Sequence, residues 1–106
     1  MKKICIIGSG RQGTAAAYDL VKYLGDVDLT FLDIEESQAE KASERIASLL
    51  GYKPKSESFD ILNQKLLVDF LGPYDIFLSS VPYQFNPYLT DVAIQSKTSM
   101  VDLGGH

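Results

Sequence analysis

The sequence has little or nothing of three features that would direct its interpretation elsewhere. Its one cysteine, Cys5, excludes an internal disulfide, and we expect a reducing, cytoplasmic location. Its 10 Lys and Arg residues are outnumbered by 14 Asp and Glu, whereas a nucleic-acid partner calls for a basic surface. No apolar run approaches the roughly 18 residues of a membrane span. We therefore expect neither nucleic acid nor membrane as a partner.

The sequence does contain an alternation of strand-like and helix-like segments along its 106 residues. Short apolar runs predict strands at 3–7, 27–32, 75–81 and 99–103, and a polar run predicts a weak edge strand at 53–59. Helical periodicity predicts helices at 11–24, 35–50, 61–71 and about 86–96. This alternation is typical of a single α/β domain whose mostly parallel sheet carries helices on both faces. We expect about five strands in the doubly wound order 3-2-1-4-5, and thus three αβα layers.

The periodicity also predicts which helical side chains face the sheet. From the first helix to the fourth, these are Ala17, Leu20, Val21, Leu24, then Ala39, Ala42, Ile46, Leu49, then Leu62, Leu66, Leu67, Phe70, then Leu89, Val92 and Ala93. Asp60 is the predicted N-cap of the third helix, and Asn86, followed by Pro87, that of the fourth.

A glycine-rich turn joins the first predicted strand to the first predicted helix, with the sequence Gly8-Ser9-Gly10-Arg11-Gln12-Gly13. Gly8 permits a tight turn, Gly10 lets the backbone approach a pyrophosphate, and Gly13 lets the helix pack on the strand. The free N–H groups at the helix start then face the anion. A strand before the motif and a helix after it predict a Rossmann-type dinucleotide site. The Arg11 side chain either contacts a phosphate or points outward while only its backbone binds.

An acidic residue, Asp33, follows the last glycine by 20 positions and ends the second predicted strand. There its carboxylate could accept both hydroxyls of an adenosine ribose. The next residues include Glu35 and Glu36 but no base, and a ribose 2′-phosphate would be repelled there. The sequence therefore predicts NAD as the cofactor, with NADP less favoured.

Two further strand ends belong to the predicted site, because ligands of open α/β sheets bind at the carboxyl ends of the strands. At the fourth strand, Val81 and Pro82 would form an apolar wall, and Ser79 or Ser80 could hydrogen-bond a ribose. The aromatic residues just beyond, Tyr83 and Phe85, would either form a lip on the substrate side or simply cover the end of the sheet.

The fifth strand contributes the two candidates for a catalytic role. Asp102 could orient a substrate or merely end its strand, and His106 belongs to the residue type best suited to acid–base chemistry near neutral pH. The sequence does not identify a catalytic residue, and it predicts no metal site.

Taken together, the glycine motif, Asp33, and the stretches 80–86 and 101–106 resemble the saccharopine dehydrogenase family. The resemblance is greatest to the branch that includes lysine 6-dehydrogenase, and it spans the whole chain but only the amino-terminal part of such an enzyme. It implies a domain that binds NAD(P) and a reaction that transfers hydride at a carbon bonded to nitrogen, in an amine or amino-acid substrate. It also implies a following domain that supplies most of the substrate site and the contacts of a homodimer.

On this resemblance, residues 1–106 form the cofactor domain, cut before its substrate domain and inactive alone. Two other classes share parts of the pattern. A non-catalytic Rossmann module that senses nucleotides and regulates a transporter would need no nicotinamide pocket, so Val81, Pro82 and Tyr83 favour the enzyme. A methyltransferase-like domain typically lacks the third glycine, here Gly13.

Overall fold

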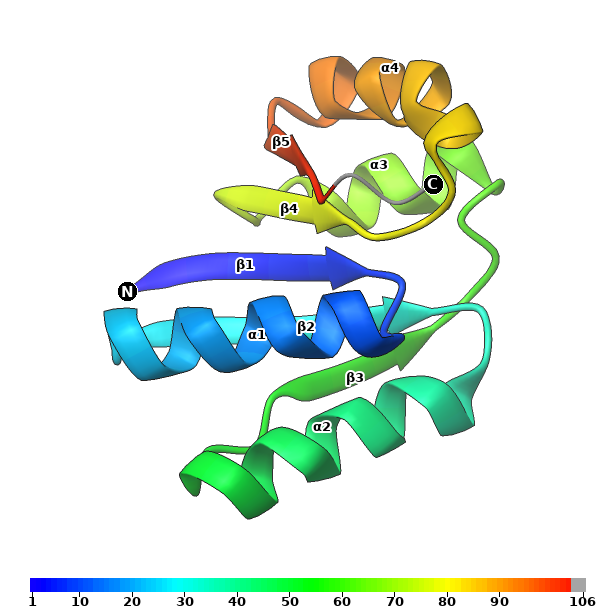
Figure 1. Cartoon of the computed structure of the whole chain (residues 1–106). Helices are drawn as coiled ribbons and strands as arrows, with labels where there is room; N and C mark the ends of the chain where they lie inside the picture. Colours follow the sequence, from blue (N-terminus) through cyan, green and yellow to red (C-terminus); the bar gives the residue numbers. More distant parts are fainter. Residues whose placement is uncertain (104–106) are drawn as a thin grey trace.

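The computed structural model describes residues 1–103 and contains a five-stranded parallel sheet in the order β3-β2-β1-β4-β5. Figure 1 shows the strands side by side with all their carboxyl ends pointing the same way. In chain order the elements are β1 (Lys2–Ile7), α1 (Arg11–Leu24), β2 (Val27–Asp33), α2 (Glu36–Leu50), β3 (Lys55–Ser58), α3 (Gln64–Leu71), β4 (Ile76–Ser79), a 3₁₀ turn (Tyr83–Phe85), α4 (Asn86–Ser96) and β5 (Ser99–Asp102). The predicted fold class and strand order are confirmed.

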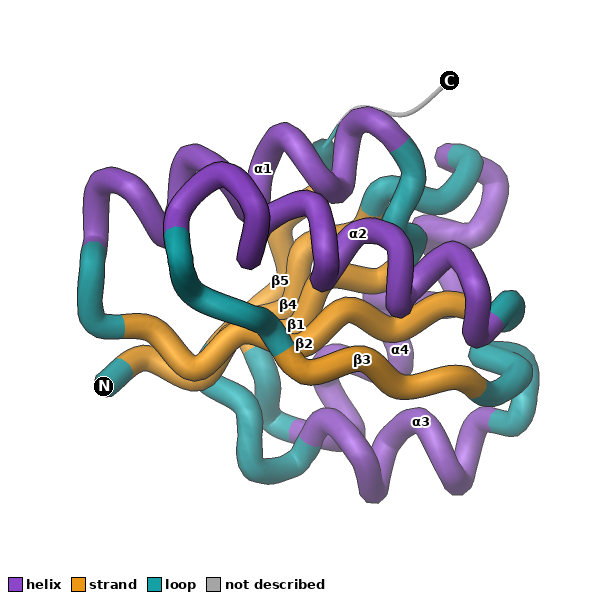
Figure 2. The backbone as a smooth tube through the Cα atoms, turned by 90° about the horizontal axis from the view of Figure 1, so that it is seen from below, coloured by secondary structure: helices purple, strands orange, loops and turns teal. Residues whose placement is uncertain are grey.

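The helices cover both faces of the sheet, with α1 and α2 on one side and α3 and α4 on the other (Figure 2). Successive side chains of a strand point to opposite faces, so β1 supplies Ile4 and Ile6 to one core and Cys5 and Ile7 to the other. This explains why the first strand is apolar at every buried position instead of alternating. The polar edge strand β3 pairs with β2 alone and is largely exposed.

Strand register brings the candidate site residues to one edge of the sheet. Ile7 lies opposite Leu32 on β2 and opposite Ser79 on β4, and Ser79 lies opposite Asp102 on β5. The residues that follow these strand ends therefore share one rim, although they are far apart in the sequence.

The third helix begins later than predicted, at Gln64, and Asn63 is its N-cap. The Asn63 side chain accepts a hydrogen bond from the Leu66 amide at 3.3 Å, whereas Asp60 accepts one from the Leu62 amide within a separate turn. Leu62 and Leu66 are 59% and 43% exposed, so their predicted burial is wrong. The predicted range of 61–71 therefore included residues of a turn that has a side-chain hydrogen bond of its own.

Three other local predictions are also corrected. Leu24 and Leu49 are exposed rather than inward, since Leu24 ends α1 and Leu49 lines a groove between α1 and α2. Ser43 is buried on α2 instead, where its hydroxyl donates to the Pro54 carbonyl. Asn86 does not cap α4, because the preceding 3₁₀ turn runs straight into the helix. Its amide donates to Asp102 at 3.0 Å.

Candidate functional site

The glycine loop has the geometry that its spacing predicts. Gly8 has φ = +87°, which strains any residue with a side chain, and its amide donates to the Leu32 carbonyl at 2.8 Å. A Cβ added to Gly13 would lie 2.2 Å from the Gly8 carbonyl oxygen, so only glycine allows this contact between helix and strand. A Cβ on Gly10 would meet nothing within 4 Å. The first and third glycines therefore serve the packing, and the second faces open space.

That open space lies at the amino-terminal end of α1. Gly10 is the N-cap of this 14-residue helix, no side chain caps it, and its first turn carries no acid. The amides of the first turn have no partner within a helix, and the helix dipole adds positive potential there. The loop can thus hold a phosphate group through its backbone alone.

Asp33 lies against this loop and is already engaged by it. Its Oδ2 accepts hydrogen bonds from the Ser9 amide at 3.0 Å and from the Ser9 hydroxyl at 2.7 Å, and its Oδ1 accepts one from the Glu35 amide at 3.0 Å. Partial burial acts to raise the pKa of Asp33, but the hydrogen bonds from Glu35, Ser9 and Ile34 outweigh it and lower the pKa. The carboxylate is therefore ionised at neutral pH and placed beside the loop.

Ser80 connects the end of β4 to the same loop. Its hydroxyl is 2.5 Å from the Gly8 carbonyl and 3.2 Å from the Ile7 carbonyl, and its amide donates to the Ile7 carbonyl at 2.9 Å. In this structure the hydroxyl is used by the loop, and its predicted contact with a ribose stays a prediction. Next to it, Val81 is half-buried against the core and Pro82 is exposed.

The end of β5 approaches the glycine motif through Gln12. The Gln12 side-chain amide donates to the Leu103 carbonyl at 2.9 Å, and the Leu103 amide donates to the Ser79 carbonyl at 2.9 Å. Asp102 is exposed and accepts the hydrogen bond from Asn86. His106, the other candidate for a catalytic role, lies outside the described residues.

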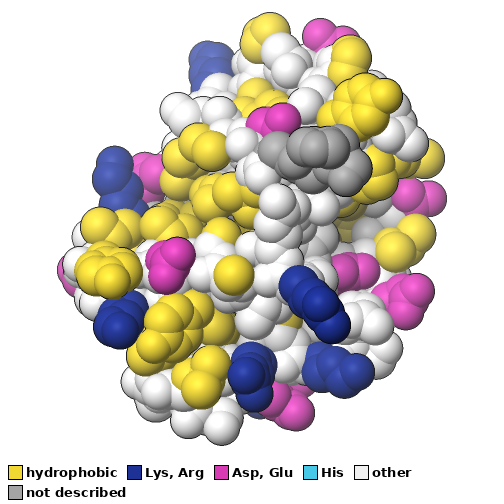
Figure 3. Space-filling view, in the orientation of Figure 1, with side chains coloured by type: hydrophobic (Ala, Val, Ile, Leu, Met, Phe, Trp, Pro, Cys, Tyr) yellow, Lys and Arg dark blue, Asp and Glu magenta, His cyan; other side chains and the backbone are white. Residues whose placement is uncertain are grey.

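A groove between α1 and α2, of about 770 Å³, contains residues that the sequence analysis missed. Its lining includes Ser9 and Gly10 of the loop, and Gln38, Lys41 and Arg45 of α2. Figure 3 shows Lys and Arg side chains gathered over the start of α1 and the adjoining part of α2. The spacing of Gln38, Lys41 and Arg45 at i, i+3 and i+7 places them on one helix face. That signal was present in the sequence, but nothing in it pointed toward α1.

The part of the chain that the structure describes contains neither a cluster of metal-ligating side chains nor a helix able to span a membrane. Among residues 1–103, no group of three or more His, Cys, Asp or Glu side chains could hold a metal ion. Within the same residues, no helix combines the length and the apolar character needed to cross a bilayer.

Residues 4–105 match the protein family described as the saccharopine dehydrogenase NADP-binding domain. Among solved structures, apo saccharopine dehydrogenase (L-Glu forming) from Saccharomyces cerevisiae is similar, with a TM-score of 0.80 and 24% identity over 96% of this chain and 21% of that one. UDP-glucose-4-epimerase from Stenotrophomonas maltophila with bound NAD has a TM-score of 0.80 and 14% identity over 96% of this chain and 36% of that one.

Quinate dehydrogenase from Corynebacterium glutamicum in complex with NAD has a TM-score of 0.61 and 23% identity, over 76% of this chain and 27% of that one. Such identities show a shared fold. The chain spans between 21% and 36% of the lengths of these three proteins.

Proposed function

Since the chain belongs to the saccharopine dehydrogenase NADP-binding domain family, we propose that it is the dinucleotide-binding part of an oxidoreductase acting on C–N bonds. The reaction would transfer a hydride between nicotinamide and a carbon bonded to nitrogen in an amine or amino-acid substrate. Placement in the lysine 6-dehydrogenase branch, with a role in lysine metabolism, is part of this proposal. It rests on the residues of the stretches 80–86 and 101–106.

The observation that carries the proposal is the different surroundings of the three glycines. Gly8 and Gly13 allow the loop and α1 to pack at distances that a Cβ would prevent, while Gly10 leaves the helix start open. A purely structural turn would have no need of the open position. The residues present therefore fit a dinucleotide, whose diphosphate the amides of the first turn of α1 would hold.

The residues of this chain have separate roles in the proposed site. The loop from Gly8 to Gly13 binds the diphosphate, and Asp33 accepts a hydroxyl of the adenosine ribose. Val81 and Pro82, at the end of β4, border the nicotinamide half. When bound, the cofactor supplies the hydride chemistry, whereas the protein supplies position and electrostatics.

Calorimetric titration of NAD into the 106-residue chain, and into its Asp33→Ala variant, tests the proposal. A hydrogen bond to a charged group is worth roughly 1.5–3 kcal/mol, so we expect Asp33→Ala to weaken NAD binding by about tenfold or more. Asp91→Ala is a matched control, because Asp91 is an exposed acid on α4, away from the loop. Failure of the unchanged chain to bind NAD would contradict the proposal, and equal binding by the Asp33 variant would remove Asp33 from the site.

We expect the cofactor site and the amine site to lie in different segments of the protein. We expect these 106 residues to bind the dinucleotide without turning over an amine, because the groups that would hold the substrate are expected in a following domain. Steady formation of NADH by this chain with any amine would contradict that expectation.

The family match supports a dehydrogenase over a nucleotide sensor of a transporter. The cytoplasmic location and the homodimer stay predictions from the sequence.

A further inference from the structure

The Gln12 side chain joins the start of α1 to the end of β5, 91 positions away in the sequence. Gln12 is the second residue of α1 and is exposed to solvent. Its Nε2 donates to the carbonyl of Leu103, whose side chain is half-buried against the core on the α1 side of the sheet. A carbonyl oxygen only accepts hydrogen bonds, so the nitrogen of the side-chain amide must face it. Gln12 is thereby directed toward β5 and does not line the groove between α1 and α2.

The end of β5 is one of the least buried parts of the sheet. Among the strands of residues 1–103, β5 pairs with β4 alone, and three of its four residues are exposed. Just beyond it, the Leu103 amide donates to the Ser79 carbonyl at 2.9 Å, and the Leu103 carbonyl accepts the bond from Gln12, also at 2.9 Å. A strand end with little buried surface opens locally at a small cost in free energy. Each hydrogen bond at Leu103 therefore contributes much to keeping this end of β5 in place.

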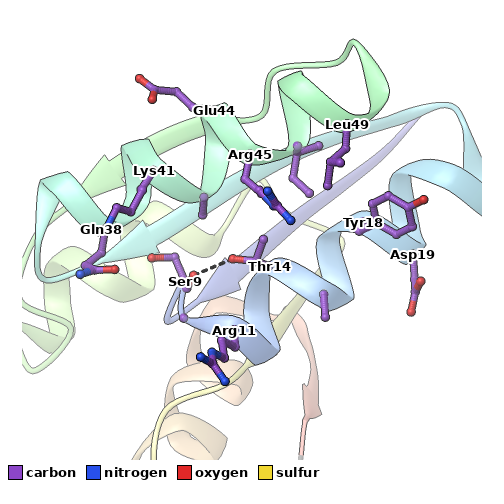
Figure 4. A pocket seen from close by; sticks show the side chains of 14 residues that line it. Ser9, Arg11, Thr14, Tyr18, Asp19, Gln38, Lys41, Glu44, Arg45 and Leu49 are labelled. Carbon is purple, nitrogen blue, oxygen red and sulfur yellow. Dashed lines mark hydrogen bonds between the residues drawn. The ribbon is translucent and has the colours of Figure 1, made fainter.

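The glycine loop, in contrast, is held by hydrogen bonds that are separate from the bond between α1 and β5. The Thr14 hydroxyl donates to the Ser9 carbonyl at 2.8 Å, as the dashed line in Figure 4 shows. Ser9 is also bound to the Asp33 carboxylate, and the Ser80 hydroxyl holds the start of the loop. Loss of the bond between α1 and β5 should therefore release the end of β5 and leave the loop in place.

The Gln12 hydrogen bond lies on the side of the loop opposite to Asp33. In the sheet, β1 has β2 on one side and β4 on the other, with β5 beyond β4. Asp33 ends β2, whereas Leu103 follows β5. Ligands of open α/β sheets lie across the carboxyl ends of the strands. In the proposed site the adenosine ribose lies at Asp33 and the diphosphate at the loop, so only the nicotinamide half extends toward β5.

From these observations we propose that Gln12 is a positioning residue for the nicotinamide half of the dinucleotide. By holding the Leu103 carbonyl, it fixes the end of β5 beside the end of β4, where that half would lie. It acts through the backbone of β5 and contacts neither the adenosine half nor the reacting atoms. This inference rests on the proposed function and deepens it.

The test compares NAD with ADP, which has the adenosine half and a diphosphate but no nicotinamide riboside. Calorimetry measures both dissociation constants for the 106-residue chain and for Gln12→Met, which keeps the length of the side chain and removes its hydrogen-bond donor. NAD should bind Gln12→Met more weakly by about threefold or more, as for the loss of one hydrogen bond, and ADP binding should be unchanged. Gln95→Met makes the same change at an exposed position of α4 and should alter neither constant.

Amide hydrogen exchange tests the structural part of the inference without any nucleotide. In Gln12→Met the Leu103 amide should exchange faster by about threefold or more, because its bond to Ser79 opens more often when the neighbouring bond is missing. The Gly8 amide, which is bound to the Leu32 carbonyl, should exchange at the same rate in both proteins. Circular dichroism and thermal melting verify that each variant is folded. Equal exchange of the Leu103 amide in the two proteins would overturn the inference.

The binding outcomes separate this inference from the proposed function. If the unchanged chain binds neither nucleotide, both fail. If the unchanged chain binds NAD and Gln12→Met binds it equally well, the inference fails and the proposed function stands. Equal loss of NAD and ADP in Gln12→Met would also overturn the inference, because Gln12 would then serve the diphosphate.

Discussion

Gly13→Ala should destabilise the fold, because the new methyl group would collide with backbone and not with a flexible side chain. Its Cβ would lie 2.2 Å from the Gly8 carbonyl oxygen, and 3.1 Å from both the Ile6 Cγ2 and the Ser80 Oγ. The Gly8 carbonyl cannot easily retreat, since it is hydrogen-bonded to Ser80 and its own amide is bound to Leu32.

The expected loss follows from two opposing effects. Overpacking a rigid site costs about 1–3 kcal/mol, and occasionally more, and a backbone obstacle places this site at the upper end. The better helix propensity of Ala returns at most about 1 kcal/mol. A net loss of about 2 kcal/mol should lower the melting temperature by roughly 8 °C or more for a domain of this size.

Gly10→Ala is the matched control, since it makes the same chemical change three residues earlier. Its Cβ would meet nothing within 4 Å, and φ at Gly10 is −59°. Stability should fall by less than about 1 kcal/mol, as for a weaker N-cap, while NAD binding is lost because the methyl group occupies the approach to the amides. Thermal melting and calorimetric titration of both variants give the answer. Equal melting temperatures for Gly13→Ala and the unchanged chain would refute the packing argument.

Three further predictions concern single side chains. Ser80→Ala removes the hydroxyl hydrogen bonds that hold the loop and should cost about 1 kcal/mol of stability in denaturant unfolding. Ser79→Ala removes a buried hydroxyl without a partner in the described residues, so it should be neutral or stabilising. A larger loss of stability for Ser79→Ala than for Ser80→Ala would contradict this assignment. Burial raises the pKa of the Cys5 thiol, so thiol reagents should label it only as the chain unfolds, and rapid labelling of the native chain at neutral pH would disprove its burial. Because the pKa of Asp33 is lowered in the fold, its contribution to stability is present above the unfolded value of about 3.9 and is lost as pH falls through the folded value. Asp33→Asn should flatten the acid limb of a stability-against-pH curve, and an unchanged limb would show that the acid sensitivity has another origin.

The architecture was predictable because each element carries its own local signal. The apolar runs at β1, β2 and β4 and the turn glycines identify buried parallel strands and their connections. The alternation of strands and helices then leaves few allowed topologies. Errors occurred where a local pattern continued past its element, as at Leu62, or where a polar residue was buried through one hydrogen bond, as at Ser43.

The candidate site was predictable in part. The motif spacing indicated that Gly8 and Gly13 allow close packing, and the distance along the chain placed Asp33 near them, because parallel β1 and β2 are neighbours. The binding role of Gly10 stays a prediction. The occupation of Asp33 by Ser9 was not predictable. The Ser9 hydroxyl can donate to several acceptors, and which acceptor it reaches depends on how closely the loop packs against β2.

Sequence alone determined the order of elements, the turn that opens α1 and the acid at the end of β2, because backbone conformation and strand burial are read from residues close together in the chain. Only the tertiary structure decided that Ser80 holds the loop and that Lys41 and Arg45 line one groove with Ser9. Those contacts join residues from separate elements, and they depend on how α1, α2 and β4 pack in three dimensions.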